Sequence, residues 1–431
     1  MTTSRPRHPP PRSPDPGRPD PATPAPGDRQ APGAVVAVKR LFAAETGNYF
    51  LLLGTTLFLV VFGLVMVLSS SAVTSYTESD SFFRGFERQA LFATLGIPLM
   101  LLASRMPAIF WKKWAPLAVV VGIGLQFLTV ATPLGYEVNG NRNWIMIGSF
   151  NMQPSEIVKL ALVIWLGSVL ARKQSVLHNW KELAVAIGPV AAAAIGFVLL
   201  GRDLGTAIIV TSIVLGALFF AGVKLRHLAV VVATMVLGAA IMAFATLSRQ
   251  NRIQVWQDGC SSAADLLTDC WQTIHGWWAL ASGGIFGVGL GNSKAKWNWL
   301  PEADNDFIFA IIGEELGLVG AALVLVLFAV TAIAFVRIIR NNPDPFAKIT
   351  VSAVMVWIIG QAFVNIAVVL GVLPVLGVPL PLISAGGTAL ISSMVAIGVA
   401  LSFARKLPAD QAPERAQERA ALGRPSGGAA R

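Results

Sequence analysis

The chain has 431 residues, of which 55% are hydrophobic and only 13% are charged, and its formal net charge is +10. Apolar runs of about 20 residues, the length that spans a bilayer, recur between Tyr49 and Phe403, so the composition excludes an ordinary soluble enzyme. The positive charge indicates membrane orientation and complements anionic membrane lipid, and nothing in the sequence requires nucleic acid.

The two ends of the chain differ from the rest in composition. Residues 1–40 are rich in proline and poor in large apolar side chains, so they cannot bury enough surface to offset their chain entropy. They also lack the apolar core of a signal peptide. Residues 407–431 are rich in Ala, Arg and Gly. We expect two disordered cytoplasmic tails around a transmembrane domain at 41–406.

The apolar runs predict an all-α membrane protein with about ten transmembrane helices. Lysine and arginine are denser in the loops that lie inside when the N terminus is placed in the cytoplasm. With ten spans both termini are then cytoplasmic, and a long extracytoplasmic loop, 248–306, separates the seventh and eighth spans. The predicted spans are 49–70, 87–104, 114–132, 155–171, 184–200, 205–223, 227–247, 307–336, 347–372 and 383–404.

The long loop holds both cysteines of the chain, Cys260 and Cys270. A thiol pair in an oxidising compartment usually bridges, so we expect a disulfide here. Further along the loop, four tryptophans bracket a glycine-rich turn, a pattern typical of a segment that lies at the lipid headgroups.

Polar residues at membrane depth are costly and usually mark a site or a pathway. Glu156 and Lys159 lie three residues apart and therefore share one helix face. They are candidates for substrate binding, and the alternative is an ion pair that only packs the bundle. Arg142 and Asp203 fall at the outer ends of spans, where Asp203 is also suited to cap a helix.

Five acids lie in the stretch "LPEADNDFIFAIIGEELG", residues 300–317. Asp306 stands at the start of the eighth span, where a helix dipole favours a carboxylate, so simple capping is one explanation for it. Glu314 and Glu315 lie about 12 Å deeper at 1.5 Å per residue. We expect them to need buried partners, and Lys159 or Arg142 is our hypothesis.

Cations and carboxylates together predict an outward-facing cavity for a lipid-linked, phosphate-activated donor. Cations suit a pyrophosphate, while carboxylates suit a general base or an all-oxygen site for a divalent cation such as Mg²⁺ or Mn²⁺. Asp306 is the residue through which such a metal would bind.

Six motifs resemble, in the same order, those of the SEDS proteins of bacterial cell-wall synthesis. They are "NGNRNWI", "QPSEIVKLAL", "DLGTAIIV", "ALASGGIFGVGLG", "LPEADNDFIFAIIGEELG" and "PLPLISAGGTALI". The resemblance implies an inverting peptidoglycan glycosyltransferase that polymerises lipid II into a nascent glycan chain on the outer face of the cytoplasmic membrane. It also implies a class B penicillin-binding protein as partner, with other divisome proteins, because the division member of the family is the better match.

The resemblance makes Asp306 the catalytic residue and Glu156, Lys159, Arg142, Asp203 and Ser384 candidates for substrate binding. The chain departs from the family at two motifs. Asn143 stands directly before Trp144, where the family usually has a basic residue. The family's "SYGG" is "SAGG" here, starting at Ser384, so a phenol is missing.

Three other functions stay open at this point. A lipid II flippase or transporter would also hold buried Glu and Lys residues. The elongation polymerase of the same family is close to the division member. A scaffold that only recruits division proteins would explain the tails but not the charged cavity.

Overall fold

The computed structural model describes residues 46–244 apart from 139, 149, 175, 176 and 178, then 256, 257, 260 and 270–405. The predicted tails and most of residues 245–269 lie outside these described residues. Each of the ten predicted spans falls on one helix. These helices are α2 (Gly47–Ser79), α3 (Arg84–Arg105), α4 (Ala108–Ala131), α5 (Pro154–Arg172), α6 (Trp180–Leu200), α7 (Leu204–Phe220), α8 (Leu225–Phe244), α11 (Ile308–Asn341), α12 (Pro345–Val369) and α13 (Gly387–Ser402).

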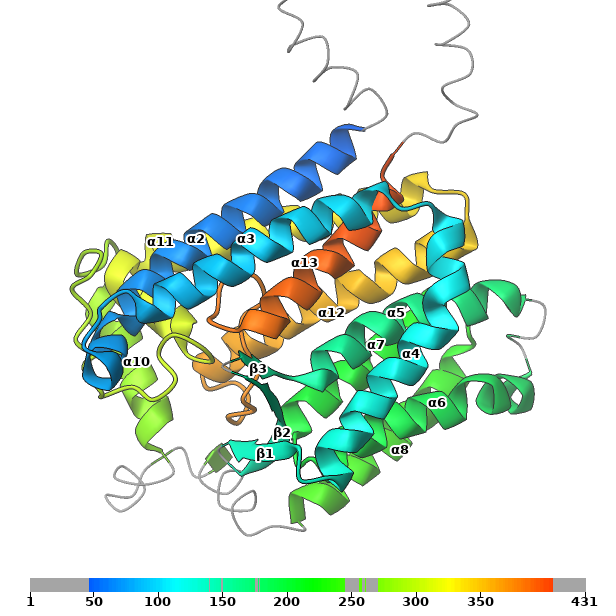
Figure 1. Cartoon of the computed structure of the whole chain (residues 1–431), viewed down its shortest axis with the longest axis horizontal. Helices are drawn as coiled ribbons and strands as arrows, with labels where there is room; N and C mark the ends of the chain where they lie inside the picture. Colours follow the sequence, from blue (N-terminus) through cyan, green and yellow to red (C-terminus); the bar gives the residue numbers. More distant parts are fainter. Residues whose placement is uncertain are drawn as a thin grey trace, which may run out of the picture. The chain divides into compact units, whose positions relative to one another are not determined.

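Seven of these helices are long and apolar enough to cross a membrane. Shorter apolar helices in the described part of the chain are α7, α13 and the first part of α8, Leu225–Thr234. The all-α, multi-pass membrane fold is confirmed. The helices α5 and α12 are the most buried, and they pack on each other and on α7. In Figure 1, α13 lies between α3 and α12, and it contacts both.

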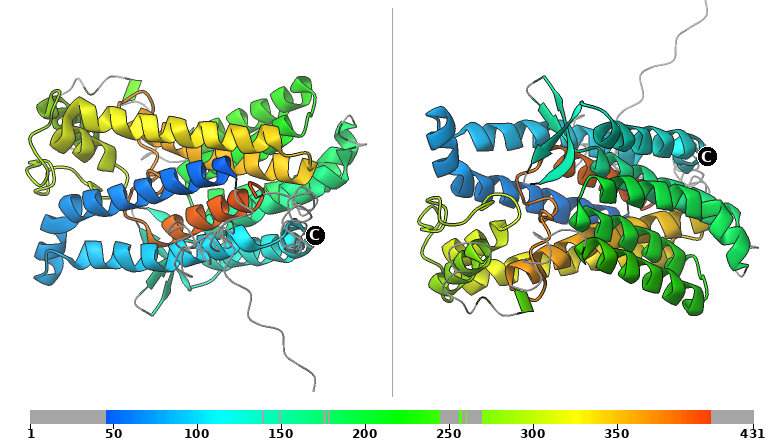
Figure 2. Two further views of the ribbon diagram at one scale, coloured as in Figure 1. Left: turned by 90° about the horizontal axis from the view of Figure 1, so that it is seen from above. Right: turned by 90° about the horizontal axis from the view of Figure 1, so that it is seen from below.

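A small antiparallel sheet joins α4 to α5, and it was not expected from the sequence. Its strands are β1 (Gly135–Val138), β2 (Asn141–Ile147) and β3 (Phe150–Met152), in the order β1-β2-β3. The two views in Figure 2 show the sheet projecting from the helices. The backbone N–H of Arg142 donates to the carbonyl of Gly201, 2.9 Å away, which ties β2 to the turn before α7.

The helix α11 is broken at Gly317, whose φ of 66° and ψ of −163° are not helical. Residues 284–289 lie against the break and form hydrogen bonds with the backbone groups that the helix leaves without intrahelical partners there. The N–H groups of Val288 and Gly289 donate to the carbonyls of Glu314 and Glu315, and the N–H of Leu318 donates to Gly284. A side chain at Gly287 would collide with this backbone, since its Cβ would lie 2.2 Å from the Glu315 carbonyl oxygen.

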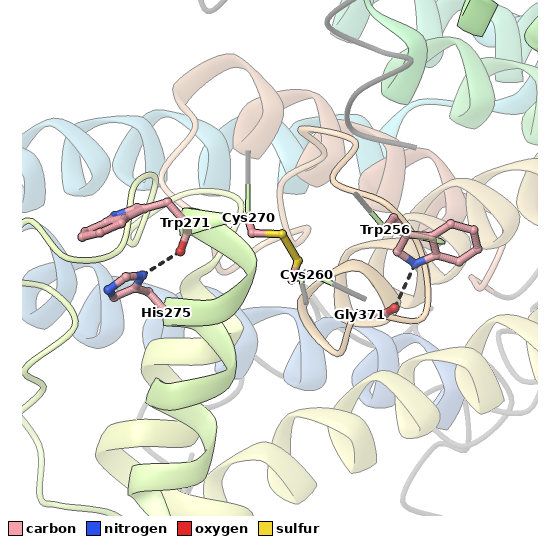
Figure 3. Close-up of a disulfide and its surroundings, with 6 residues drawn as sticks. All are labelled: Trp256, Cys260, Cys270, Trp271, His275 and Gly371. Atoms are coloured by element: carbon pink, nitrogen blue, oxygen red, sulfur yellow. Dashed lines mark hydrogen bonds between the residues drawn. A yellow bond between two sulfur atoms is a disulfide. The ribbon is translucent and has the colours of Figure 1, made fainter. Parts of the chain in front are cut away.

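The loop before α11 contains a further helix, α10 (Trp271–Gly283), which packs on α11. A disulfide joins Cys260 to Cys270, directly before α10 (Figure 3). Nearby, the Trp256 indole N–H donates to the carbonyl of Gly371, 3.0 Å away, after α12. The disulfide and this hydrogen bond therefore fix two points of a long loop next to the helices.

Candidate active site

A polar cavity of about 480 Å³ lies between β2, α5, α7, α12, the turn before α11 and the segment before α13. Among the described residues that line it, four have acidic side chains and one has a basic side chain. The polar and charged lining residues are Asn141, Asn143, Gln153, Glu156, Lys159, Asp203, Thr206, Gln272, Glu302, Asn305, Asp306, Gln361 and Thr388. We expected several cations and carboxylates to line the cavity, but its charged lining residues are mostly acidic.

Asp306 lines this cavity with a carboxylate that is only partly satisfied. Its Oδ1 atom is buried and has no hydrogen-bond partner among the described residues. The first helical residue of α11 is Ile308, and no side chain caps that end, so the capping explanation for Asp306 is wrong. Burial raises the pKa of Asp306 to about 8, with smaller contributions from the negative charges of Glu302, Asp203 and Asp304.

The backbone around Asp306 is held from α12 and from the segment before α13. The side-chain amide of Asn365 donates to the carbonyls of both Asp306 and Val378, each 2.7 Å away. The Ser384 hydroxyl donates to the Asn305 carbonyl at 2.7 Å. A Cβ added at Gly377 would lie 3.6 Å from Asp306 Oδ2, so a glycine keeps space beside this oxygen. The carboxylate is thus positioned through its backbone, while its Oδ1 has no partner among the described residues.

Asp203 is both a helix cap and a cavity residue. It is the N-cap of α7, where its Oδ1 accepts from the backbone N–H of Thr206 at 2.8 Å. Its Oδ2 accepts from the side-chain amides of Asn143 at 2.6 Å and Gln153 at 3.4 Å. Burial raises the pKa of Asp203, and the hydrogen bonds from Thr206 oppose this effect.

Glu156 and Lys159 form the buried ion pair that their spacing on α5 predicts, with 2.6 Å between Lys159 Nζ and Glu156 Oε1. The ammonium also donates to the Gln361 side chain at 3.0 Å and lies 5.0 Å from the Trp357 ring centre. The second Glu156 oxygen accepts from Ser392 at 3.0 Å. Both residues line the cavity, so the pair faces the site while being held on several sides.

Arg142 and Ser384 do not line the cavity. The Arg142 guanidinium donates to the carbonyls of Thr132 and Gly135, at 2.8 and 3.3 Å. The neighbouring Asn143 instead lines the cavity from β2. Ser384 is buried, and its hydroxyl bonds to the backbone groups of Leu380 and Asn305. Substrate binding by these two residues stays a prediction that the contacts do not favour.

The hypothesis that Lys159 or Arg142 pairs with Glu314 and Glu315 is wrong. The partner is Lys296, whose Nζ lies 3.1 Å from Glu315 Oε1. Glu315 also accepts from Ser69, and Glu314 accepts from Ser293 and from the backbone N–H of Lys294. The sequence analysis missed Lys296 because it lies in the long loop, and only the folding of that loop onto α11 brings it close.

The described residues do not form a resident metal site. No group of three or more His, Cys, Asp or Glu side chains suited to a metal comes together among them. Asp306 Oδ1 alone offers a buried carboxylate oxygen without a partner. The expected Mg²⁺ or Mn²⁺, bound through Asp306, stays a prediction.

The fold and the cavity define a multi-pass membrane protein with a buried, acid-rich site at the start of one of its spans. Residues 49–408 match the family described as cell cycle protein, whose designation combines FtsW, RodA and SpoVE. The chain belongs to this family, which is the one that the motifs indicated.

Several curated relatives are similar over most of the chain. It is 38% identical over 369 residues to the probable peptidoglycan glycosyltransferase FtsW of Mycobacterium tuberculosis, covering 86% of this chain and 70% of the relative. It is 34% identical to the stage V sporulation protein E of Bacillus subtilis, covering 84% of this chain and 98% of the relative. These matches agree with the FtsW-like motifs in the sequence.

Solved structures show the same fold at lower sequence identity. A chain from a peptidoglycan synthase complex, described as coordinating polymerization and crosslinking, superposes with a TM-score of 0.66 at 23% identity. The rod shape determining protein RodA of Thermus thermophilus gives a TM-score of 0.61 at 23% identity. Each match covers 82% of this chain and 96% of the other.

Proposed function

We propose that the chain is a peptidoglycan glycosyltransferase that polymerises lipid II into glycan strands. The observation that carries this proposal is the carboxylate of Asp306, which faces a polar cavity, has a buried oxygen without a partner and has a raised pKa. The curated relatives that are named peptidoglycan glycosyltransferases support the same activity.

Asp306 would act as the general base of an inverting displacement. An acceptor hydroxyl on one saccharide attacks C1 of the donor saccharide, the bond from C1 to the pyrophosphate oxygen breaks, and lipid pyrophosphate leaves. The hydroxyl proton passes to Asp306. A pKa of about 8 keeps this carboxylate close to the pH at which a general base is most efficient. One base suffices because inversion needs no covalent enzyme intermediate.

The negative charge of the leaving pyrophosphate needs a positive counterpart. Lys159 is the one basic residue among the described residues that line the cavity, and its ammonium is shared with Glu156 and Gln361. We assign Lys159 to the pyrophosphate, because a fixed cation in a site with little water stabilises developing charge strongly. Asp203 and Asn143 would contact the sugar or its phosphate from the start of α7 and from β2.

We also propose the cellular setting that the family implies. The active site would face the outer side of the cytoplasmic membrane, with both termini in the cytoplasm. A class B penicillin-binding protein and other divisome proteins would be partners at the division septum. Similarity to a chain of a peptidoglycan synthase complex supports a partner of this kind. The elongation role stays an alternative because the fold is shared with RodA.

The decisive experiment measures polymerisation of labelled lipid II by the purified protein in the absence of any other transglycosylase. It is run with and without the cognate penicillin-binding protein, and with and without Mg²⁺ or Mn²⁺. Glycan strands that disappear in the Asp306→Asn protein would support the proposal. Translocation of lipid II across a vesicle membrane without polymerisation in any arm would replace it by the flippase.

A further inference from the structure

A second cavity, of about 650 Å³, lies between α6, α7 and α8, and it shares no residue with the cavity of Asp306. Almost all of its wall is apolar. Ala184, Gly188 and Ala192 on α6 form one side, and Val214 on α7 and Val230 on α8 contribute to the others. Because the residues on the α6 wall are small, they do not fill the space between α6 and the other two helices, and a groove remains.

The polar groups of this groove gather at one end. Trp180 is the first residue of α6, and Arg226 and His227 lie in the first turn of α8. The groove extends along α6 from Trp180 to Ala192, about 18 Å at 1.5 Å per residue. One leaflet of the bilayer has about 15 Å of hydrocarbon. The groove therefore has the length of one lipid chain, with its polar end at the membrane surface.

The charge at this end is positive and partly unpaired. Arg226 is exposed and forms no ion pair with any described residue, and Lys181 and Lys224 are exposed nearby in the sequence. Glu182 is the acid in the first turn of α6, and it accepts a hydrogen bond from Asn179. The Nδ1 atom of His227 is buried and has no partner in the described part of the chain.

We propose that this groove binds an anionic phospholipid. One acyl chain lies along the small residues of α6, and the phosphate group meets Arg226 and His227. A basic residue at the headgroup level attracts an anionic lipid, and Trp180 is suited to the same interfacial depth. By the predicted orientation, in which α6 and α8 begin in the cytoplasm, the lipid belongs to the inner leaflet. The site is independent of the glycosyltransferase activity proposed above.

Filling the groove tests the place of the acyl chain. A Cβ at Gly188 meets no atom within 4 Å, so the side chain of Gly188→Leu grows into the groove without displacing its walls. Gly196→Leu is the matched control, because Gly196 is on the same helix, is equally open at Cβ and does not line the groove. Ala192→Phe is a second filling variant should Gly188→Leu fail to fold.

The readout is native mass spectrometry of the full chain in detergent with equal amounts of dioleoyl phosphatidylglycerol and dioleoyl phosphatidylcholine. The wild type and Gly196→Leu should retain phosphatidylglycerol preferentially. Gly188→Leu should lose about tenfold in affinity, as expected when roughly two buried CH₂ groups are displaced. Equal retention by Gly188→Leu and Ala192→Phe would overturn the proposal, as would equal binding of the two lipids by the wild type.

The charge of the headgroup is tested separately. Arg226→Gln should weaken phosphatidylglycerol binding about fivefold, which corresponds to ~1 kcal/mol for one basic residue at a lipid surface. Arg337→Gln, which removes an exposed arginine near the end of α11, should leave it unchanged. Inorganic phosphate should not displace the lipid. If filling the groove changes the oligomeric mass but not the retained lipid, the groove holds another protein chain and the proposal is wrong.

Discussion

Buried carboxylates lie at both ends of the first segment of α11: Asp306 just before it, and Glu314 and Glu315 near its end. They differ in how many hydrogen bonds their oxygens accept. Every carboxylate oxygen of Glu314 and Glu315 accepts at least one hydrogen bond, from Ser69, Lys296 or the 293–295 loop. Asp306, in contrast, keeps a buried oxygen with no partner among the described residues. The hydrogen bonds of Glu314 and Glu315 fit a structural role, whereas Asp306 has an oxygen that can still accept a hydrogen bond from a substrate.

Burial of an acidic side chain is therefore not by itself a sign of function. Both groups lie in one sequence stretch, and both would stand out in a search for charges at membrane depth. Unsatisfied buried polar atoms are rare in folded proteins, so a free oxygen in a cavity separates the two groups better than burial does. Substitutions in each group test this distinction.

The largest effect is expected for Asp306→Asn. Asparagine keeps the shape of the side chain but cannot take up the hydroxyl proton, and loss of a general base typically lowers a rate by about 10² to 10⁴. Polymerisation of labelled lipid II measures the rate. Above about pH 4 the variant should be at least as stable to thermal unfolding in detergent as the wild type, because asparagine does not ionise in the unfolded chain. Near-normal polymerisation by this well-folded variant would show that Asp306 is not the base.

A slightly smaller effect is expected for Lys159→Met, which leaves the carboxylate of Glu156 without its cation. Removing one partner of a buried pair costs about 3–5 kcal/mol. The double variant Glu156→Leu with Lys159→Met separates two roles. If the pair only packs the bundle, the double variant recovers both stability and polymerisation. If Lys159 serves the pyrophosphate, stability recovers but polymerisation does not, which is the result we expect.

The corresponding change in the other group is Lys296→Met. Glu315 would lose its cation but keep Ser69, so we expect a loss of stability near ~3 kcal/mol, the lower end for a broken buried pair. Chemical or thermal unfolding in detergent measures it. The folded fraction should polymerise lipid II at the wild-type rate per molecule. A selective loss of rate without a loss of stability would place Lys296 in the active site instead.

A fourth prediction concerns the pH dependence that Asp306 confers on stability and rate. Because its pKa is raised from 3.8 to about 8, the native protein holds a proton that the unfolded chain has released. Stability should therefore fall as the pH rises from about 4 to 8, and Asp306→Asn should lack this part of the pH dependence. The polymerisation rate should rise about tenfold per pH unit until it levels off near pH 8. A flat profile from pH 6 to 9 would contradict the raised pKa.

The last prediction is that the loop holding Cys260 and Cys270 lies on the outer side of the membrane. A membrane-impermeant thiol reagent should label Cys260 and Cys270 in intact cells only after reduction. Labelling before reduction would mean that the disulfide does not form in the cell. Labelling that requires lysis would place this loop, and the cavity beside it, on the cytoplasmic side.

The spans and part of the site could be predicted because they depend on local signals. Ten apolar runs gave ten helices, and Glu156, Lys159, Asp203 and Asp306 do meet at one cavity. The small sheet was missed because its strands are short and lie between glycines, with no long alternation of polar and apolar residues.

The rest of the site depends on tertiary contacts that spacing does not reveal. The direction of the Arg142 side chain is set by the carbonyls of Thr132, before β1, and of Gly135, the first residue of β1. The pairing of Lys296 is set by a loop. Asn365 offered a usable signal, because an amide in the apolar run of α12 requires partners. Its amide donates to the carbonyls of Asp306 and Val378 and so holds the Asp306 backbone beside the segment before α13.

The break in α11 leaves a short first segment, 308–316, which starts next to Asp306 and ends at Gly317, where the backbone changes direction. The amides of Val288 and Gly289 donate to carbonyls at the end of this segment, and the Asn365 amide donates to the carbonyl of Asp306 at its start. The inserted loop and the Asp306 carboxylate are therefore joined through one short helical segment, although the loop lies outside the cavity lining.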